Sequence, residues 1–178
     1  MTAADVAALR GHVREIPDFP RPGVSFKDIT PLFADATALR AARDALARHA
    51  SRLGADLVVS AEARGFVLGG AVASEIGAGF VVARKPGRLP REATRVEYEL
   101  EYGLDSLEVH RDALLAGSRV LVHDDLLATG GTAGALCGLV QRAGATVAGC
   151  AFVIELTFLE GRARLVPHTV HSLLQYDS

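Results

Sequence analysis

Cysteine is scarce in this sequence, and the two cysteines show none of the patterns that bind metals or form disulfide scaffolds. Cys137 and Cys150 are the only ones among 178 residues. Both lie in apolar segments, with no CxxC motif and no histidine at ligand spacing. We therefore expect two reduced thiols in the hydrophobic core, with no role in metal binding or catalysis.

Long apolar runs and a strong excess of charge are also missing. No run reaches the roughly 18 apolar residues of a membrane-spanning helix. The first 20 residues have neither the basic start nor the apolar core of a signal peptide. The formal net charge of −2 gives no general attraction to nucleic acid or anionic membranes. We therefore expect a soluble, cytoplasmic protein that binds neither nucleic acid nor a membrane.

The chain has enough apolar residues for one packed core. Hydrophobic residues make up 49% of the sequence, and a chain of this length buries about 70% of its unfolded surface on folding. We expect a single domain over residues 1–178.

Helical and extended patterns alternate along the chain. Apolar residues at helical spacing and short β-prone runs predict helices at 1–12, 35–53, 66–76 and 132–143, and strands at 24–29, 56–60, 79–84, 119–125 and 145–156. Alternation of this kind is typical of an α/β fold, in which a parallel sheet is covered by helices on both faces. Ligands of such sheets bind at the carboxyl ends of the strands.

One segment interrupts this alternation. Residues 85–110 are far longer than a usual connection between a strand and the next element. Within them, residues 94–102 and 107–110 could pair as a β-hairpin around Gly103. Since the segment is internal, we interpret it as a lid.

The stretch VLVHDDLLATGGT, residues 120–132, is a candidate binding site. Asp124 and Asp125 fall at the carboxyl end of a predicted strand, where two carboxylates can accept hydrogen bonds from a vicinal diol. The turn that follows is made of small and hydroxyl residues and leads into a helix, whose N-terminal N–H groups favour phosphate. Its residues are Ala128, Thr129, Gly130, Gly131 and Thr132.

Two observations bear on how specific this stretch is. A glycine- and threonine-rich turn before a helix is also ordinary capping chemistry, so the turn alone does not decide between capping and phosphate binding. No Gly-Lys-Ser/Thr follows the turn, and no GxGxxG is present, which excludes a Walker loop and the dinucleotide fingerprint.

A family resemblance adds to this interpretation. The strand, the two acids and the Thr-Gly-Gly-Thr turn resemble the ribose-5-phosphate motif of the type I phosphoribosyltransferases. Six segments, in order and over nearly the whole chain, resemble the adenine phosphoribosyltransferases: PRPGVSFKDITPLF, EARGFVLG, VARKPGRLP, YELEYGLDSLEVH, DDLLATGGTA and ELTFLEGR. The resemblance implies a central, mainly parallel sheet flanked by helices, a flexible hairpin lid at about 85–110 and a small N-terminal hood at about 1–34.

The same resemblance implies a reaction in purine salvage. Ribose 5-phosphate would pass from phosphoribosyl pyrophosphate to N9 of adenine, giving AMP and pyrophosphate. Mg²⁺ would be carried by the pyrophosphate and water, without direct protein ligands. Asp124 and Asp125 would hold the ribose hydroxyls, and residues 128–132 the 5-phosphate. A homodimer is also implied.

The resemblance implies further roles outside this stretch. Pyrophosphate would be bound by Ala63, Arg64, Gly65, Arg84 and Lys85. In this superfamily such a basic residue often acts on the neighbouring subunit's site, so Arg84 and Lys85 are candidates for action in trans. A solvated basic loop is the alternative for these cations, more so for Arg88 and Arg91.

In the lid, Glu101 would protonate or hydrogen-bond the purine, and Tyr102 would pack over the ligand. Only the resemblance singles out Glu101, because Glu97, Glu99 and Glu101 could equally be the exposed face of a strand.

Adenine selection would fall to the backbone of an extended segment and to apolar side chains that sandwich the ring. The candidates are Val24, Phe26, Lys27 and Leu159. Without the resemblance, Phe26 and Leu159 would be interpreted as core residues. Lys27 stands where the family more often has arginine, which matters little if the backbone selects the base.

His123 also departs from the family, which has an apolar residue before the two acids. We expect its side chain to be satisfied locally and to point away from that of Asp124.

Two alternatives remain at this stage. The base could be hypoxanthine, guanine or xanthine in place of adenine. The chain could also be a nucleotide-responsive regulator without activity, although it has no room for a DNA-binding domain.

Overall fold

The centre of the fold is a parallel sheet. The structure is a computed structural model that describes residues 1–99 and 104–178. Five strands of the described chain pair in the order β4-β3-β7-β8-β9, every pair parallel. They are β3 (Leu57–Ala61), β4 (Gly79–Ala83), β7 (Arg119–Leu127), β8 (Thr146–Leu156) and β9 (Val170–Tyr176). The predicted α/β class and parallel sheet are confirmed.

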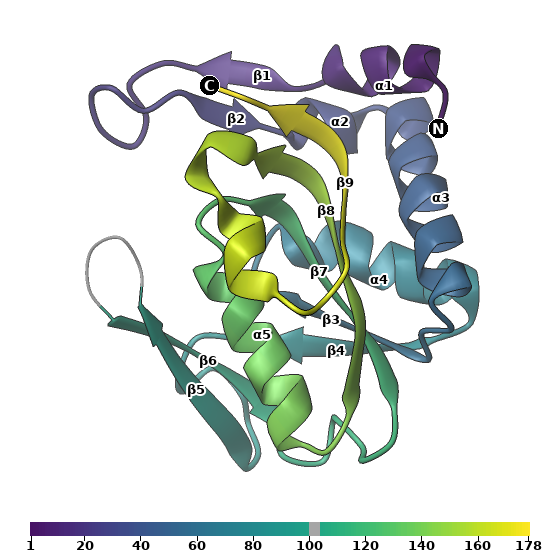
Figure 1. Ribbon diagram of the computed structural model, residues 1–178, viewed down its shortest axis with the longest axis vertical. Coiled ribbons are helices and arrows are strands. Elements are labelled where there is room, and N and C mark those ends of the chain that lie inside the picture. The colour runs from purple at the N-terminus through teal and green to yellow at the C-terminus, as the bar shows by residue number, and fades with distance from the viewer. Residues whose placement is uncertain (100–103) are drawn as a thin grey trace.

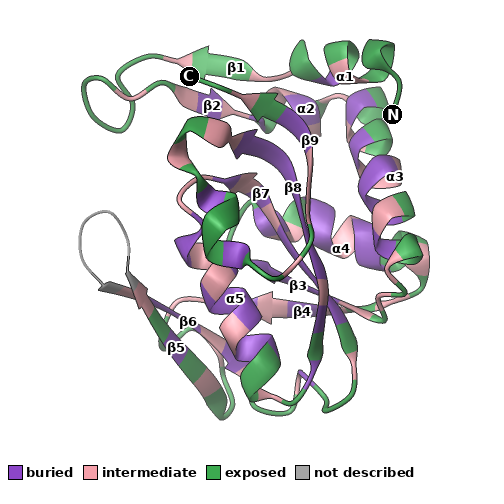
Figure 2. Cartoon of the chain, in the orientation of Figure 1, coloured by how far each residue is buried: buried purple, intermediate pink, exposed green. Residues whose placement is uncertain are grey.

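Helices cover both faces of this sheet (Figure 1). Helix α5 (Gly131–Arg142) lies on one face, and α3 (Ala36–Arg52) and α4 (Gly65–Ile76) lie on the other. Neighbouring strand residues therefore enter different clusters: Val59 packs on the α5 side, and Val58 on the side of α3 and α4. Figure 2 shows that buried residues run along the central strands, as expected for strands covered on both faces.

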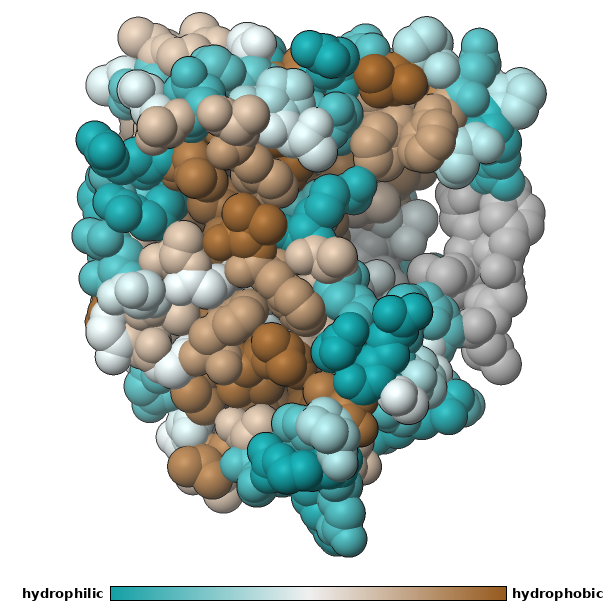
Figure 3. Space-filling view, turned by 180° about the vertical axis from the view of Figure 1, so that it is seen from behind, coloured by the Kyte–Doolittle hydropathy of each residue, from teal (hydrophilic) through white to brown (hydrophobic). Residues whose placement is uncertain are grey.

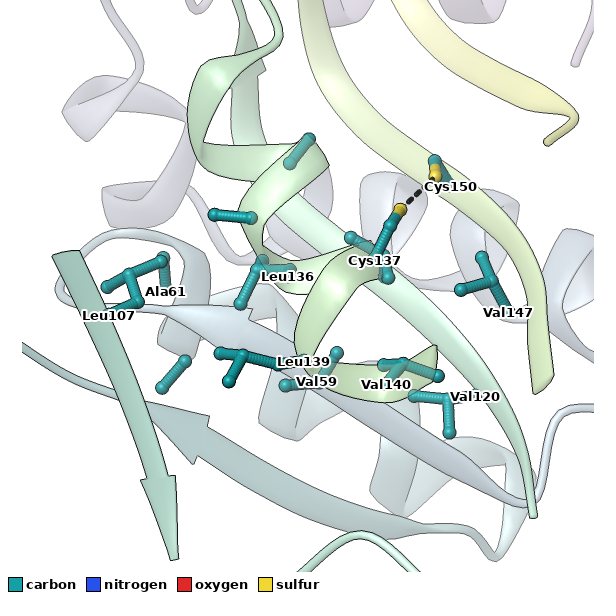
Figure 4. Close-up of a cluster of buried hydrophobic side chains, with 14 of the residues drawn as sticks. Val59, Ala61, Leu107, Val120, Leu136, Cys137, Leu139, Val140, Val147 and Cys150 are labelled. Atoms are coloured by element: carbon teal, nitrogen blue, oxygen red, sulfur yellow. Dashed lines mark hydrogen bonds between the residues drawn. The ribbon is translucent and has the colours of Figure 1, made fainter. Parts of the chain in front are cut away.

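The two cysteines belong to the core on the α5 side. Cys137 of α5 and Cys150 of β8 are buried, and their Sγ atoms lie 3.7 Å apart (Figure 4). Both are free thiols. The expectation of reduced core cysteines is therefore confirmed.

The N-terminal residues form a small layer above the ends of β8 and β9 (Figure 1). It contains α1 (Ala3–Arg10), α2 (Thr30–Ala34) and an antiparallel pair of strands, β1 (Arg14–Ile16) and β2 (Phe26–Asp28). The first helix is shorter than predicted because the chain turns after Arg10 and enters β1. The prediction of an extended segment at 24–29 is confirmed at β2.

A β-hairpin within 85–110 is confirmed, although its strands differ in bounds from those predicted. Strands β5 (Ala93–Glu99) and β6 (Leu104–His110) pair antiparallel, with Val96 opposite Leu107. Both of these side chains are buried in the cluster on the α5 side, so the hairpin is anchored to the domain at its base. The predicted turn at Gly103 lies outside the described residues.

Three parts of the chain near the C-terminus were not predicted. Strand β9 and the short 3-10 helices η1 (Thr157–Leu159) and η2 (Gly161–Leu165) follow β8 without a long helix such as α4 between β3 and β4 or α5 between β7 and β8.

Among the described residues, no helix is both long and apolar enough to cross a membrane.

Two histidines in the interior make stability depend on pH. His49 of α3 stacks on His171 of β9, with ring centroids 4.4 Å apart. Burial, together with His171 and Arg52, lowers the pKa of His49 from 6.5 to about 4. Burial also lowers the pKa of His123 from 6.5 to about 4. Both rings are therefore neutral in the folded chain at neutral pH.

We predict that the free energy of unfolding falls as the pH falls from 6.5 towards about 4. In this window each of the two histidines binds more protons in the unfolded chain than in the folded chain, by at most one, which contributes about 1.4 kcal/mol per pH unit for each ring. The raised pKa of Asp124 offsets part of this slope. Urea unfolding measured at several pH values would test this. His49→Gln should have a shallower slope than the wild type, and equal slopes would contradict the assignment to His49.

Candidate active site

A polar cavity opens at the carboxyl ends of β3 and β7. Its volume is about 330 Å³. Four parts of the chain line it: the end of β3 with the turn that follows, the second residue after β4, the hairpin, and the end of β7 with the start of α5. The lining residues are Ala61, Glu62, Ala63, Arg64, Lys85, Tyr98, Leu107, Asp124, Asp125 and Thr132.

The two adjacent carboxylates lie on the wall formed by β7. The backbone of α4 approaches one of them closely, because a Cβ added at Gly65 would lie 2.6 Å from Oδ1 of Asp124. Burial and the neighbouring Asp125 raise the pKa of Asp124 well above its usual value. A group that donates hydrogen bonds or carries positive charge would favour the ionised form at this position.

Arg64 connects these carboxylates with the N-terminal layer. Its Nε donates to Oδ2 of Asp125 at 2.6 Å. The guanidinium carbon also lies 5.1 Å from the centre of the Phe26 ring, within the range of a cation–π contact. The predicted pyrophosphate residue Arg64 thus contacts both a predicted ribose residue and a predicted adenine residue.

Lys85 faces the cavity from the opposite side, where the hairpin supplies its partner. Its Nζ forms an ion pair with Asp105 of β6. The Tyr98 hydroxyl donates to the same Oδ2 of Asp105 at 3.1 Å. Burial raises the pKa of Tyr98, and a hydrogen bond with Thr132 opposes this rise. A chain of polar contacts therefore runs from Lys85 through the hairpin to the start of α5.

Glu62 organises the cations at the end of β4. Its carboxylate accepts from Nε of Arg84 at 2.7 Å and from the backbone N–H of Lys85 at 3.0 Å. Burial alone would raise the pKa of Glu62, but Arg84, the N–H of Lys85 and Arg88 together lower it. The guanidinium of Arg84 also donates to the carbonyl of Arg88 at 3.0 Å, and Arg84 does not line the cavity.

The turn before α5 is packed tightly against the chain that follows β8. Gly130 has φ 82°, a conformation that favours glycine, and α5 begins at the next residue. A Cβ at Gly130 would lie 2.5 Å from the carbonyl oxygen of Gly161, and a Cβ at Gly161 would collide with the carbonyl oxygen of Ala128. Two glycines therefore allow two backbone segments to meet.

An ion pair between a buried carboxylate and an exposed arginine holds the second of these segments. Glu155, only 2% exposed at the end of β8, is bound through both carboxylate oxygens by Arg162 of η2. Ser172 donates to Oε2 of Glu155 at 2.5 Å and Gln175 at 3.2 Å, both from β9. Since Leu159 and Gly161 lie between Glu155 and Arg162, this pair fixes the segment that carries them.

The predicted adenine residues lie apart from the cavity lining. Phe26 is half-buried, packs edge-on against Phe19 at 5.2 Å and is reached by Arg64. Val24 and Leu159 are half-buried. The ammonium of Lys27 is paired with Glu15 and lies 4.9 Å from the Tyr176 ring centre, which leaves only the backbone of Lys27 for binding a ligand.

Three predictions concern single residues. His123 is fully buried, its Nδ1 lies 2.9 Å from the carbonyl oxygen of Ala151, and it does not line the cavity. The expectation of local satisfaction is therefore confirmed for Nδ1 only, because the buried Nε2 has no hydrogen-bond partner among the described residues. Glu101 and Tyr102 lie outside the described residues.

Several residues of the site were missed from the sequence. Glu62, Tyr98 and Asp105 contact or line the cavity, and Glu155 with Arg162 supports it. Glu62 sits in the predicted turn AEARG, so its position was available as a signal. Tyr98 and Asp105 become neighbours only through the register of the hairpin, and no local pattern indicates it.

Comparisons with known proteins agree on one family. The model of the phosphoribosyl transferase domain matches residues 32–170. The adenine phosphoribosyltransferase of Rubrobacter xylanophilus is 58% identical, over 99% of this chain and 96% of its own. The crystal structure of adenine phosphoribosyltransferase from Thermoanaerobacter pseudethanolicus has a TM-score of 0.93 at 48% identity, covering 96% of this chain and 99% of that one. The Saccharomyces cerevisiae enzyme, solved with adenine and an imino-altritol bisphosphate, has a TM-score of 0.92 at 37% identity, covering 97% of this chain and 100% of that one.

We predict that Gly161→Ala displaces the turn at residues 128–132, because its methyl group would collide with the Ala128 carbonyl. The expected cost is about 1–3 kcal/mol of unfolding free energy, measured by urea denaturation. Gly138→Ala in α5 is the matched control, since its Cβ would meet only Val96 at 3.8 Å. If both variants were equally stable, the two segments would not be packed as described.

Proposed function

The chain belongs to the adenine phosphoribosyltransferases within the phosphoribosyltransferase family, and we propose that the cavity at the ends of β3 and β7 binds its substrates. The enzyme transfers ribose 5-phosphate from phosphoribosyl pyrophosphate to N9 of adenine, giving AMP and pyrophosphate in purine salvage. The observation that carries the proposal is that paired carboxylates, a helix N-terminus and two cations line or adjoin one cavity.

The ribose 5-phosphate group binds along the wall formed by β7 and α5. Asp124 and Asp125 accept hydrogen bonds from the two ribose hydroxyls. The 5-phosphate is held by residues 128–132, where the N-terminal N–H groups of α5 and the hydroxyls of Thr129 and Thr132 are donors. Small residues in this turn let the backbone itself approach the phosphate.

Pyrophosphate binds on the opposite wall. Ala63, Arg64 and Gly65 supply backbone donors and one guanidinium, and Lys85 supplies an ammonium group. Lys85 and Arg64 line the same cavity, which supports their action within one subunit. The Arg84 guanidinium is held by Glu62 and by the Arg88 carbonyl outside the cavity lining, and this supports action of Arg84 on a neighbouring subunit.

The charges of the cavity suit a substrate that arrives with Mg²⁺. The lining has three carboxyl groups, on Glu62, Asp124 and Asp125, and two cations, Arg64 and Lys85, so a pyrophosphate group alone would meet no excess of positive charge. Mg²⁺ is carried by pyrophosphate oxygens and water, and the carboxylates can accept hydrogen bonds from that water. When bound, it neutralises charge on the departing pyrophosphate.

Catalysis combines positioning with charge stabilisation. As pyrophosphate departs, C1 of the ribose becomes oxocarbenium-like, and the enzyme holds this carbon against N9 of the base. Glu101 of the lid protonates or hydrogen-bonds the purine, and Tyr102 packs over the ligand so that water is excluded.

The base binds between the N-terminal layer and the segment after β8. Backbone groups of Val24–Lys27 complement the amino donor and ring acceptor of adenine, while Phe26 and Leu159 contact the flat ring. Two observations support this: the Lys27 ammonium is already paired with Glu15, and Arg64 links Phe26 to the cavity. Residues 1–34 act as the hood, and residues 85–110 act as the lid.

A homodimer is supported by the rear face of the molecule. Figure 3 shows apolar side chains gathered down the middle of this face, the side on which α4 lies. Val67 of α4 is 44% exposed, and Phe66 and Ala71 are partly exposed. An apolar surface on a packed helix is typical of a subunit interface.

Two free thiols in the core are consistent with a reducing, cytoplasmic location.

We predict that adenine is the purine consumed in the presence of phosphoribosyl pyrophosphate and Mg²⁺. A spectrophotometric assay with adenine, hypoxanthine, guanine and xanthine would measure this, and adenine should have the highest kcat/KM. Turnover of a 6-oxopurine without turnover of adenine would refute the base specificity while leaving the reaction class intact.

We also predict that Asp125→Asn weakens binding of phosphoribosyl pyrophosphate roughly tenfold or more, because a charged acceptor of ribose hydroxyls is lost. Calorimetric titration would measure the affinity, and the unfolding midpoint would show that the variant is folded. Asp44→Asn is the control, since this partly buried residue pairs with Arg43 on α3, away from the cavity lining. Unchanged affinity in Asp125→Asn would remove the ribose assignment.

A further inference from the structure

Each cation that we assign to pyrophosphate already contacts a carboxylate. Arg64 pairs with Asp125, Arg84 with Glu62, and Lys85 with Asp105. A polyanion that binds to these cations must therefore compete with the protein's own carboxylates. In the first two pairs the carboxylate lines the cavity and belongs to the walls from β3 and β7. The third carboxylate comes from the hairpin.

Asp105 is held in place independently of Lys85. It lies on β6 opposite Tyr98 of β5, and the Tyr98 hydroxyl donates to its Oδ2 at 3.1 Å. The backbone N–H of Ser106 donates to its Oδ1 at 2.7 Å. Because both oxygens have other donors, Asp105 can keep its position when Lys85 turns to another anion.

The hairpin also forms hydrogen bonds with the backbone next to Lys85. Arg84 and Glu108 exchange backbone hydrogen bonds of 2.9 and 2.8 Å, and the N–H of Gly87 donates to the Glu108 carboxylate at 3.0 Å. The main chain at Lys85 is therefore fixed against β6. What remains free to change partner is the four-carbon side chain of Lys85, whose ammonium reaches both Asp105 and the cavity.

The ion pair of Lys85 with Asp105 is only partly buried, so its charges still interact and its ammonium can still change partner. The side chains of Lys85 and Asp105 are 38% and 23% exposed. Burial would lower the pKa of Lys85, but the hydrogen bond with Asp105, the neighbouring Tyr98 and the charge of Asp105 raise it. Part-buried charges are screened less than fully exposed ones. The negative charge of Asp105 therefore attracts the Lys85 ammonium and at the same time repels an anion bound nearby.

We propose that Asp105 is a positioning residue that competes with pyrophosphate for Lys85 and thereby weakens binding of phosphoribosyl pyrophosphate and of the product pyrophosphate. The inference rests on the proposed role of Lys85 in pyrophosphate binding. In the unliganded enzyme Asp105 keeps the ammonium at the mouth of the cavity. When the substrate enters, the ammonium moves to a phosphate oxygen. When the products leave, Asp105 takes it back, which favours release.

Asp105→Asn is the variant that tests the proposal, because it removes the charge and keeps the size of the side chain. The amide oxygen can still accept from the Ser106 N–H, and the amide NH₂ can donate to the Tyr98 hydroxyl in place of the bond that Tyr98 now donates. We expect the KM for phosphoribosyl pyrophosphate and the inhibition constant of pyrophosphate to fall about three- to fivefold. The KM for adenine should stay unchanged. In a Lys85→Met background the same substitution should have a clearly smaller effect, because the competition requires the ammonium group.

Asp112→Asn is the matched control. Like Asp105, Asp112 pairs with a basic residue close to the hairpin, in this case Arg91. Both side chains of this pair are mostly exposed, and neither lines the cavity. This variant should leave all three constants unchanged. The unfolding midpoints of both variants should be compared with the wild type, since a purely structural role of Asp105 would lower stability without lowering either constant.

The opposite results would overturn the proposal. A rise in the KM for phosphoribosyl pyrophosphate in Asp105→Asn would mean that Asp105 presents Lys85 to the substrate and does not compete for it. Unchanged constants would mean that the pair has no influence on binding. Wild-type protein without any adenine turnover would refute the proposed function instead. In that case calorimetry with pyrophosphate and Mg²⁺ on both proteins would still decide whether Asp105 weakens anion binding.

Discussion

The parallel pairing of β3 with β7 is the constraint on which the whole site depends. Their register sets Ser60 opposite His123, so the turn after β3 and the two acids of β7 emerge at the same edge of the sheet. No side chain has to reach far: Arg64, in the turn after β3, meets Asp125, near the end of β7, at 2.6 Å. The buried valines of both strands fix this register from both faces, which means that the apolar core determines the geometry of the polar site.

The site is built with more carboxylates than a phosphate-binding protein would seem to need. Free anion sites usually present unpaired N–H groups and cations. Here the assigned cations are neutralised by Asp125, Glu62 and Asp105, and the pKa of Asp124 is raised by burial and by Asp125. When a pyrophosphate ester binds with its metal, each cation exchanges a carboxylate for a phosphate oxygen. The net gain in electrostatic attraction is therefore small. Such a design suits an enzyme, because very tight binding of either substrate or product would slow turnover.

The sequence was most informative where the function depends on neighbouring residues. Asp124, Asp125 and the turn at 128–132 stand out as a candidate site because strand, acids, glycines and helix follow one another directly, and the family resemblance gave them their proposed roles. Arg64 and Lys85 each follow the end of a strand, and it was again the resemblance that assigned them to pyrophosphate. Asp105 and Tyr98 could not, since their contact with Lys85 depends on the register of a hairpin whose strands were predicted only approximately. Glu155 was missed for a related reason: its partners lie on η2 and β9, and neither element has a periodic apolar pattern.

The support of the phosphate turn shows why such residues matter to the chemistry. Arg162 and two residues of β9 surround Glu155, and this network fixes the segment in which Gly161 touches the Ala128 carbonyl. The same segment carries Leu159, which we assign to the base. One piece of chain therefore contacts the turn that we assign to the 5-phosphate and carries the residue that we assign to the purine. The nucleophilic nitrogen and the ribose carbon must meet within a few tenths of an ångström of the reactive geometry. With the proposed assignments, the ion pair of Glu155 with Arg162 contributes to positioning from outside the cavity, because it sets the spacing between the two ligands.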